Sequence, residues 1–175
     1  ASWIDAFEKI KLARKPSVLE IASGDSDPIP QALEIYSEGE GSYVSANLNR
    51  ILTEGLKRRT ASLRIEVKVI EDNAVNLEKY IEPEAFDVVT FQHAINDVIQ
   101  TIIADRKGID TANSDWFDIL PAMIQGVAEY YRQEKLREVA YEEFIDLIGV
   151  CWRLLKRGGY MIFNTHVYQV DLDCG

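Results

Sequence analysis

The chain has 175 residues, of which 47% are hydrophobic and 27% are charged, a composition that suits a folded domain with one core. Its formal net charge of −10 disfavours a nucleic-acid partner, because binding to phosphates depends on lysine and arginine side chains. No stretch approaches the ~20 apolar residues that cross a bilayer, and the first residues lack a signal-peptide pattern, so we expect a cytoplasmic protein without a membrane anchor.

Short apolar runs alternate along the chain with segments of helical periodicity. Residues 1–17 predict an N-terminal helical segment, which Pro16 interrupts. The strands that follow are expected at residues 18–22, 43–46, 65–69, 86–91 and 160–163. Five strands separated by helical patterns predict an α/β domain over residues 18–175, with a doubly wound, mainly parallel sheet and helices on both faces.

Residues 98–137 form an unusually long connection between the fourth strand and the last helix. Pro121 should end or kink a helix locally. Apolar and aromatic residues nevertheless recur at helical spacing, at Trp116, Ile119, Leu120, Met123, Val127 and Tyr130. The pattern predicts a helical insertion, or lid, rather than a flexible loop.

The turn after the first strand is a candidate ligand site, because ligands of doubly wound sheets bind at the carboxyl ends of the strands. It reads Ser23-Gly24-Asp25, and its small residues would let backbone amides approach a ligand. The lysine of a phosphate-binding loop and the three glycines of a dinucleotide fingerprint are both missing. The acidic residues Glu20, Asp25 and Asp27 would suit a ligand with an amino or sulfonium group, although the last two could equally cap the next helix.

Five segments, in chain order, resemble the motifs of class I S-adenosylmethionine-dependent methyltransferases. They are residues 18–24, Asn47 after the second strand, residues 71–74 after the third, residues 86–98 around the fourth, and residues 154–163, where Gly158-Gly159 should stop the last helix. The resemblance implies a Rossmann-like fold that binds S-adenosylmethionine, with Asn47 at the position that holds the ribose and Asp72 at the position that meets the adenine amino group. The cofactor-binding residues that it implies are Glu20, Ala22, Ser23, Gly24, Asn47, Asp72, Asn73, Ala74 and Gln92.

Three residues depart from the family's pattern. Ala22 and Ser26 replace glycines, and the methyl group of Ala22 is tolerable if its φ angle is negative. Asn47 replaces an acid, and its amide can still accept a hydrogen bond, although a weaker one. The family also adds two strands after the fifth, so we expect that this chain is a fragment that lacks them.

Histidines are the candidate catalytic residues, because a hydroxyl acceptor needs a base. His93 follows the fourth strand, where the family meets its substrate, and a structural role is its alternative. His166 and, in the insertion, Trp116 are candidates for substrate contacts. Asn96 and Asp97 are interpreted as helix-capping residues, and the two cysteines suggest neither a disulfide framework nor a metal site.

The sequence therefore predicts a methyltransferase that acts on an oxygen, nitrogen or carbon atom of a small-molecule acceptor. A protein methyltransferase is one alternative, because the acidic surface would suit a basic substrate segment. A non-catalytic interaction module is another, because the changes at Ala22, Ser26 and Asn47 could mark the loss of efficient cofactor use.

Overall fold

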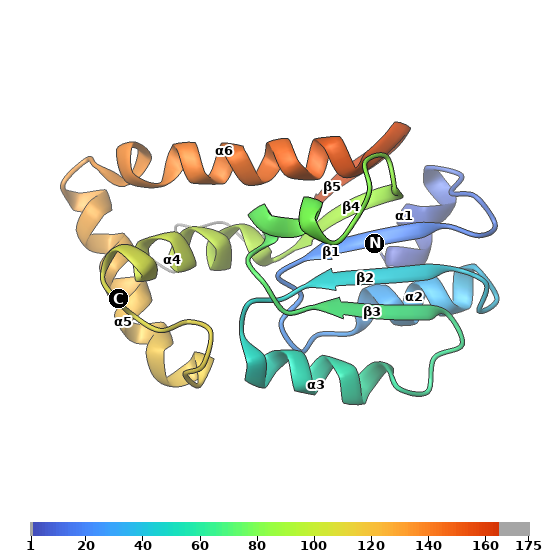
Figure 1. The fold of residues 1–175 in the computed structure, drawn as a ribbon, viewed down its shortest axis with the longest axis horizontal. Coiled ribbons are helices and arrows are strands. Elements are labelled where there is room, and N and C mark those ends of the chain that lie inside the picture. The colour runs from blue at the N-terminus through green and yellow to red at the C-terminus, as the bar shows by residue number, and fades with distance from the viewer. Residues whose placement is uncertain (1, 165–175) are drawn as a thin grey trace.

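The computed structural model describes residues 2–164, which form one parallel sheet with helices on both faces (Figure 1). The strands are β1 (Ser17–Ile21), β2 (Ser42–Ala46), β3 (Glu66–Ile70), β4 (Phe86–Gln92) and β5 (Leu155–Asn164). They lie in the order β3-β2-β1-β4-β5, and all four pairings are parallel. The predicted doubly wound α/β fold is confirmed.

Two hydrophobic cores cover the two faces of the sheet. On one face, α1 (Trp3–Lys9), α2 (Pro28–Tyr36) and α3 (Arg50–Thr60) contribute Phe7, Leu33 and Leu56 to a core that includes Val18 and Val88. On the other face, η1 (Ala74–Lys79) and α6 (Leu136–Leu154) pack against the alternate strand positions, among them Leu19, Ile21, Val89 and Phe91. Burial on both faces explains why β1 and β4 read as continuous apolar runs rather than as alternating patterns.

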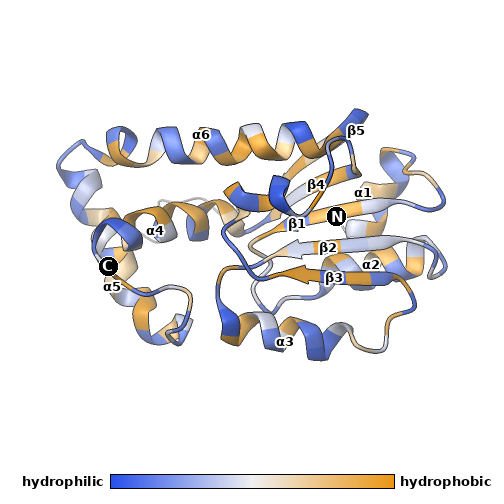
Figure 2. Ribbon diagram, viewed as in Figure 1, coloured by the Kyte–Doolittle hydropathy of each residue, from blue (hydrophilic) through white to orange (hydrophobic). Residues whose placement is uncertain are grey.

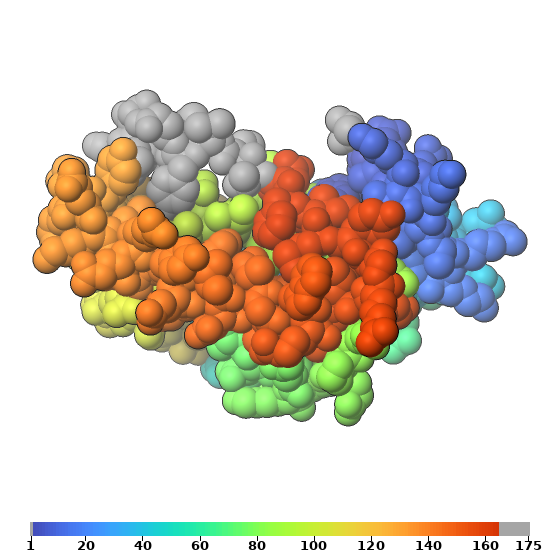
Figure 3. Space-filling view, turned by 90° about the horizontal axis from the view of Figure 1, so that it is seen from above, coloured from blue at the N-terminus to red at the C-terminus, as the bar shows by residue number. Residues whose placement is uncertain are grey.

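Helix α6 covers its face of the sheet with one side only. It carries hydrophobic and hydrophilic bands in Figure 2, and it runs beside β5 and over η1 in Figure 3. Leu147, Cys151 and Leu154 are buried, whereas Trp152 is 71% exposed. The guanidinium of Arg153 donates two hydrogen bonds of 2.8 Å to the carboxylate of Glu78, which fixes α6 against η1.

The predicted helical insertion follows β4 and extends past the carboxyl edge of the sheet (Figure 1). It consists of α4 (Ala94–Arg106) and α5 (Trp116–Arg132), followed by the first part of α6. The two helices approach closely at Gly126, where a Cβ atom would lie 3.1 Å from Ile103. Helix α5 continues through Pro121, so the helix does not end at this residue.

The glycine pair near the end of the chain does not stop the last helix, as the sequence had suggested. Helix α6 already ends at Leu154, and Gly158-Gly159 lie within β5. The pairing of β4 and β5 shifts between Phe86 and Val88, and Gly158 has a φ angle of +78°. The glycines therefore serve a bulge that needs a left-handed residue.

No helix within residues 2–164 combines the length and the apolarity that crossing a membrane requires. The two strands that the family adds would follow β5, and the residues after Asn164 lie outside the described part of the chain.

Candidate functional site

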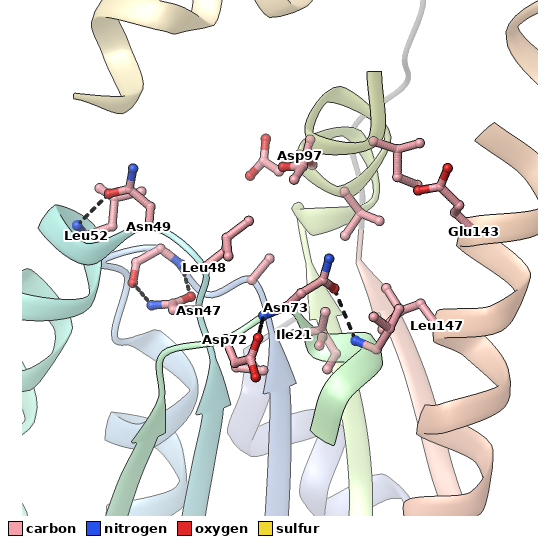
Figure 4. A pocket seen from close by; sticks show the side chains of 18 of the residues that line it. Ile21, Asn47, Leu48, Asn49, Leu52, Asp72, Asn73, Asp97, Glu143 and Leu147 are labelled. Atoms are coloured by element: carbon pink, nitrogen blue, oxygen red, sulfur yellow. Dashed lines mark hydrogen bonds between the residues drawn. The ribbon is translucent and has the colours of Figure 1, made fainter. Parts of the chain in front are cut away.

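A cavity of about 290 Å³ opens at the carboxyl edge of the sheet (Figure 4). Its first side consists of the turns that follow β1, β2 and β3, including Ala22, Asn47 and Asp72. Its second side consists of α4, the start of α5 and α6, including Trp116 and Leu147. The cavity therefore lies where a doubly wound sheet is expected to bind its ligand, and the insertion forms one of its walls.

The turn after β1 is tightly wound. Ala22 has a φ angle of +52° and Gly24 one of +61°, and the amide of Ala22 donates to the carbonyl of Ala46 at 2.9 Å. The condition that φ at Ala22 be negative is therefore not met. A left-handed conformation costs a residue with a Cβ atom roughly 1–2 kcal/mol, so this turn is strained at the position where the family has glycine.

Asn47 fixes this turn to the end of β2. Its Oδ1 accepts from the amide of Gly24 at 3.1 Å and from the hydroxyl of Ser23 at 3.2 Å. Its Nδ2 donates to the carbonyl of Gly24 at 2.6 Å. An aspartate at this position could not make the last bond, because an ionised carboxylate only accepts. The asparagine thus has a structural role, because it binds both the amide and the carbonyl group of Gly24.

Glu20 lies behind the turn rather than in the cavity lining. Its side chain is 1% exposed and accepts a hydrogen bond of 2.6 Å from the hydroxyl of Tyr43. Burial raises the pKa of Glu20 to about 8, against the lowering effect of the Tyr43 hydrogen bond. Ser23 is buried as well, with its hydroxyl 2.6 Å from that of Ser45. These two predicted cofactor residues therefore support the turn from behind.

Asp72 lines the cavity with its carboxylate held in one orientation. It accepts from the amide of Asn73 at 2.6 Å, from Nδ2 of Asn76 at 2.9 Å and from the hydroxyl of Tyr80 at 2.7 Å. These hydrogen bonds lower the pKa of Asp72, and the bond from Tyr80 has the largest effect. The carboxyl group is therefore ionised at neutral pH. Asn73 and Ala74 line the cavity beside it, and Oδ1 of Asn73 accepts from the amide of Val75 at 3.1 Å.

Two predicted site residues at the end of β4 do not line the cavity. The side-chain oxygen of Gln92 accepts a hydrogen bond from the indole of Trp3, and Gln92 does not line the cavity. His93 is exposed, has a φ angle of +55° and precedes α4, and it does not line the cavity either. The structure thus does not bring these two predicted residues to the others. His166 lies outside the described residues.

Both sides of the cavity contain residues that the sequence analysis did not identify. Trp116, a candidate for substrate contacts, lines the cavity, and so does Asp97, which the sequence analysis interprets as a helix-capping residue. Three of them, Glu143, Asp146 and Leu147, could have been grouped from the sequence, because their spacing places them on one face of a helix. The lining residues that were not among the candidates are Ile21, Ala46, Leu48, Asn49, Leu52, Val75, Asp97, Val98, Thr101, Ile102, Glu143, Asp146 and Leu147.

The lining is acidic. It includes the carboxylates Asp72, Asp97, Glu143 and Asp146 and, among the described residues, no lysine or arginine. Glu143 is paired with Arg106 at 2.6 Å. Within residues 2–164, no group of three or more histidine, cysteine or acidic side chains is arranged to hold a metal ion.

Comparisons with known proteins identify the fold. No family model and no curated protein matches the sequence. A solved structure of a SAM-dependent methyltransferase from Aquifex aeolicus matches with a TM-score of 0.56 at 10% identity, covering 91% of this chain and 61% of that chain. The trans-methyltransferase CalH, in complex with SAH, matches with a TM-score of 0.52 at 15% identity, covering 97% and 37%.

A SAM-dependent methyltransferase from Thiobacillus denitrificans, in complex with S-adenosyl-L-homocysteine, matches with a TM-score of 0.50 at 17% identity, covering 91% and 46%. This chain therefore spans 37–61% of the length of these three proteins. The likeness shows that the chain has the fold of class I S-adenosylmethionine-dependent methyltransferases.

Proposed function

We propose that this chain, which has a methyltransferase fold, binds S-adenosylmethionine in its cavity and transfers the methyl group to an oxygen, nitrogen or carbon atom of a small-molecule acceptor. The observation that carries the proposal is the convergence of Ala22, Gly24, Asn47 and Asp72 on one cavity at the carboxyl edge of the sheet. These residues come from three different turns, and a shared ligand is the simplest reason for their convergence.

The residues of the first side fit the parts of this cofactor. The ionised carboxylate of Asp72 can accept a hydrogen bond from a ribose hydroxyl or an adenine amino group. Leu48, Leu52 and Val75 supply apolar surface for a planar base. Gly24 lines the cavity, and a Cβ atom built there would meet only Leu52, at an ordinary contact distance of 3.7 Å. In this proposal Asn47 acts by holding the turn, because its amide is bound to Gly24.

The second side of the cavity would hold the acceptor. When the cofactor is bound, its sulfonium makes the methyl group electrophilic, so the protein's part is to align the acceptor and to take up its proton. Trp116, Val98 and Leu147 offer apolar contacts for that alignment. Asp97 lines the cavity and His93 does not, so the geometry favours Asp97 over His93 as the proton acceptor.

The charges of the lining restrict the acceptor. Four carboxylates line the cavity, and within residues 2–164 no lysine or arginine lines it. A phosphate or carboxylate placed about 4 Å from one of them would be repelled by roughly 4 kcal/mol at the effective dielectric constant of a protein surface. We therefore propose a neutral or cationic acceptor.

Calorimetric titration with S-adenosylhomocysteine tests the proposal. We expect micromolar binding by the wild type, and we expect that Asp72→Asn weakens it by about 10–100-fold, because a hydrogen bond to an ionised acceptor is replaced by one to a neutral amide. Asp118→Asn is the matched control, since Asp118 is an exposed carboxylate that does not line the cavity. Equal losses in both variants, or no binding by the wild type, would reject the cofactor site.

A second candidate function is a non-catalytic interaction module. It is favoured by the strained φ angle of +52° at Ala22, a position where the methyltransferase motif has glycine. The same titration separates the two candidates. A module that has lost the cofactor site would show no heat of binding when S-adenosylhomocysteine is added at micromolar concentrations.

A further inference from the structure

The loop between α4 and α5 is tied to the start of α3 by a clamp of three hydrogen bonds. Nδ2 of Asn49 donates to the carbonyl of Thr111 at 2.8 Å and to that of Ser114 at 2.9 Å. The amide of Arg50 donates to the carbonyl of Ala112, which lies between them, at 3.0 Å. These bonds join segments that are about sixty positions apart in the sequence, and they lie at the rim of the cavity.

Asparagine is the side chain that this clamp requires. Its Oδ1 accepts from the amide of Leu52 at 3.0 Å and so caps α3, as seen in Figure 4. Its two amide protons go to the two carbonyls of the loop, and the residue is only 4% exposed. An aspartate or a serine could keep the cap but could not donate both bonds.

The clamp connects the two sides of the cavity. On one side, Asn47 lies two positions before Asn49 and holds the turn at Gly24. On the other side, Ser114 is followed by Asp115, whose carboxylate accepts from the amide of Phe117 at 2.9 Å and so begins α5. Trp116, the first residue of α5, lines the cavity.

We propose that Asn49 is a positioning residue that couples the insertion to the cofactor-binding edge of the sheet. With the clamp closed, Trp116 and the start of α5 wall the cavity; with the clamp open, the loop separates from α3 and the ligand can leave. This inference rests on the proposed function for its ligand, but the clamp itself can be measured without any ligand.

Hydrogen exchange of the Arg50 amide, followed by NMR, reports on the clamp directly. We expect Asn49→Asp to keep the cap of α3, but its carboxylate would face the two carbonyl oxygens of the loop without donating to them. The loop should then separate from α3 more often, and exchange of the Arg50 amide should accelerate by about 10-fold. Asn49→Ser should act in the same direction without adding charge. Asn73→Asp is the matched control, because it adds the same charge to the same cavity at another capping position and should leave the Arg50 amide protected.

Unchanged protection of amides in β1 and β4 verifies that the variants are folded. If the Arg50 amide exchanges at the wild-type rate in both Asn49 variants, the clamp does not hold the loop and the inference is overturned.

The dissociation rate of S-adenosylhomocysteine tests the coupling. We expect it to rise by about 10-fold in Asn49→Ser, because the wall formed by α5 opens more often. A wild-type dissociation rate together with accelerated exchange at Arg50 would overturn the coupling. An absence of binding to the wild-type protein would instead reject the proposed function, and the exchange experiment distinguishes this failure from a failure of the clamp.

Discussion

Replacing Glu20 by glutamine should stabilise the protein at pH 8 and above while having little effect near pH 4. Glu20 is 1% exposed, and burial raises its pKa to about 8, whereas the ordinary value is 4.5. Between these two values the unfolded chain has released the proton that the folded protein still binds. The free energy of unfolding of the wild type therefore falls as the pH rises through this window, and it levels off once the folded protein is also ionised.

The size of the effect follows from the width of the window. One pKa unit corresponds to 1.36 kcal/mol, so the full difference between about 8 and 4.5 amounts to roughly 5 kcal/mol above pH 8 and roughly 3 kcal/mol at pH 7. Glutamine does not titrate and keeps an oxygen that can accept the hydrogen bond from Tyr43. The variant should lose the pH dependence that Glu20 causes and little else.

Urea unfolding of the wild type and of Glu20→Gln between pH 4.5 and 9 measures this difference. Titration of the other carboxylates is common to both proteins and cancels in the comparison. Glu66→Gln is the control, because it makes the same chemical change at an exposed residue of β3. A constant difference between the wild type and Glu20→Gln over the whole range would refute the reasoning, since it would mean that Glu20 ionises alike in both states.

Two further substitutions test the turn after β1. Ala22→Gly should raise the free energy of unfolding by up to about 1 kcal/mol, because relief of the left-handed strain exceeds the added entropy of the unfolded chain; thermal unfolding measures it, and a lower melting temperature would contradict it. Asn47→Asp should lower the free energy of unfolding by about 1–3 kcal/mol, because the carbonyl of Gly24 loses its donor and faces a carboxylate. Urea unfolding at pH 7 measures this loss. The control is Gln125→Glu, the same change from amide to carboxylate at an exposed residue of α5, and equal effects of the two changes would argue against the prediction.

The fold could be predicted because its signals are local. Apolar runs such as that of β4 are buried on both faces of a parallel sheet, and they are recognisable without knowledge of their neighbours. The alternation of strands with helical segments then indicated a mainly parallel sheet with helices on both faces. The end of α6 was missed because Gly158-Gly159 suit a helix end and a β-bulge equally well, and only the pairing with β4 decides between them.

The site was predictable only in part. Asp72 and Asn47 line the cavity, because the position after a parallel strand fixes the edge of the sheet at which a side chain emerges. The sign of φ at Ala22 and the direction of Gln92 depend on contacts with Ala46 and Trp3, which lie far away in the sequence. Local sequence patterns contain no information on such contacts. The cofactor-binding role of Gln92 and the catalytic role of His93 stay predictions.

Two asparagines two positions apart organise the cavity by the same chemistry. Asn47 and Asn49 each direct Nδ2 to backbone carbonyls of a distant segment, the turn at Gly24 and the loop before α5. Both are nearly inaccessible to solvent, at 2% and 4% exposure, so water cannot replace the donors if they are removed. A carboxylate at either position would keep the accepted bonds and lose the donated ones. The neutral amide at position 47 is therefore better explained by its bonds within the protein than by a loss of function.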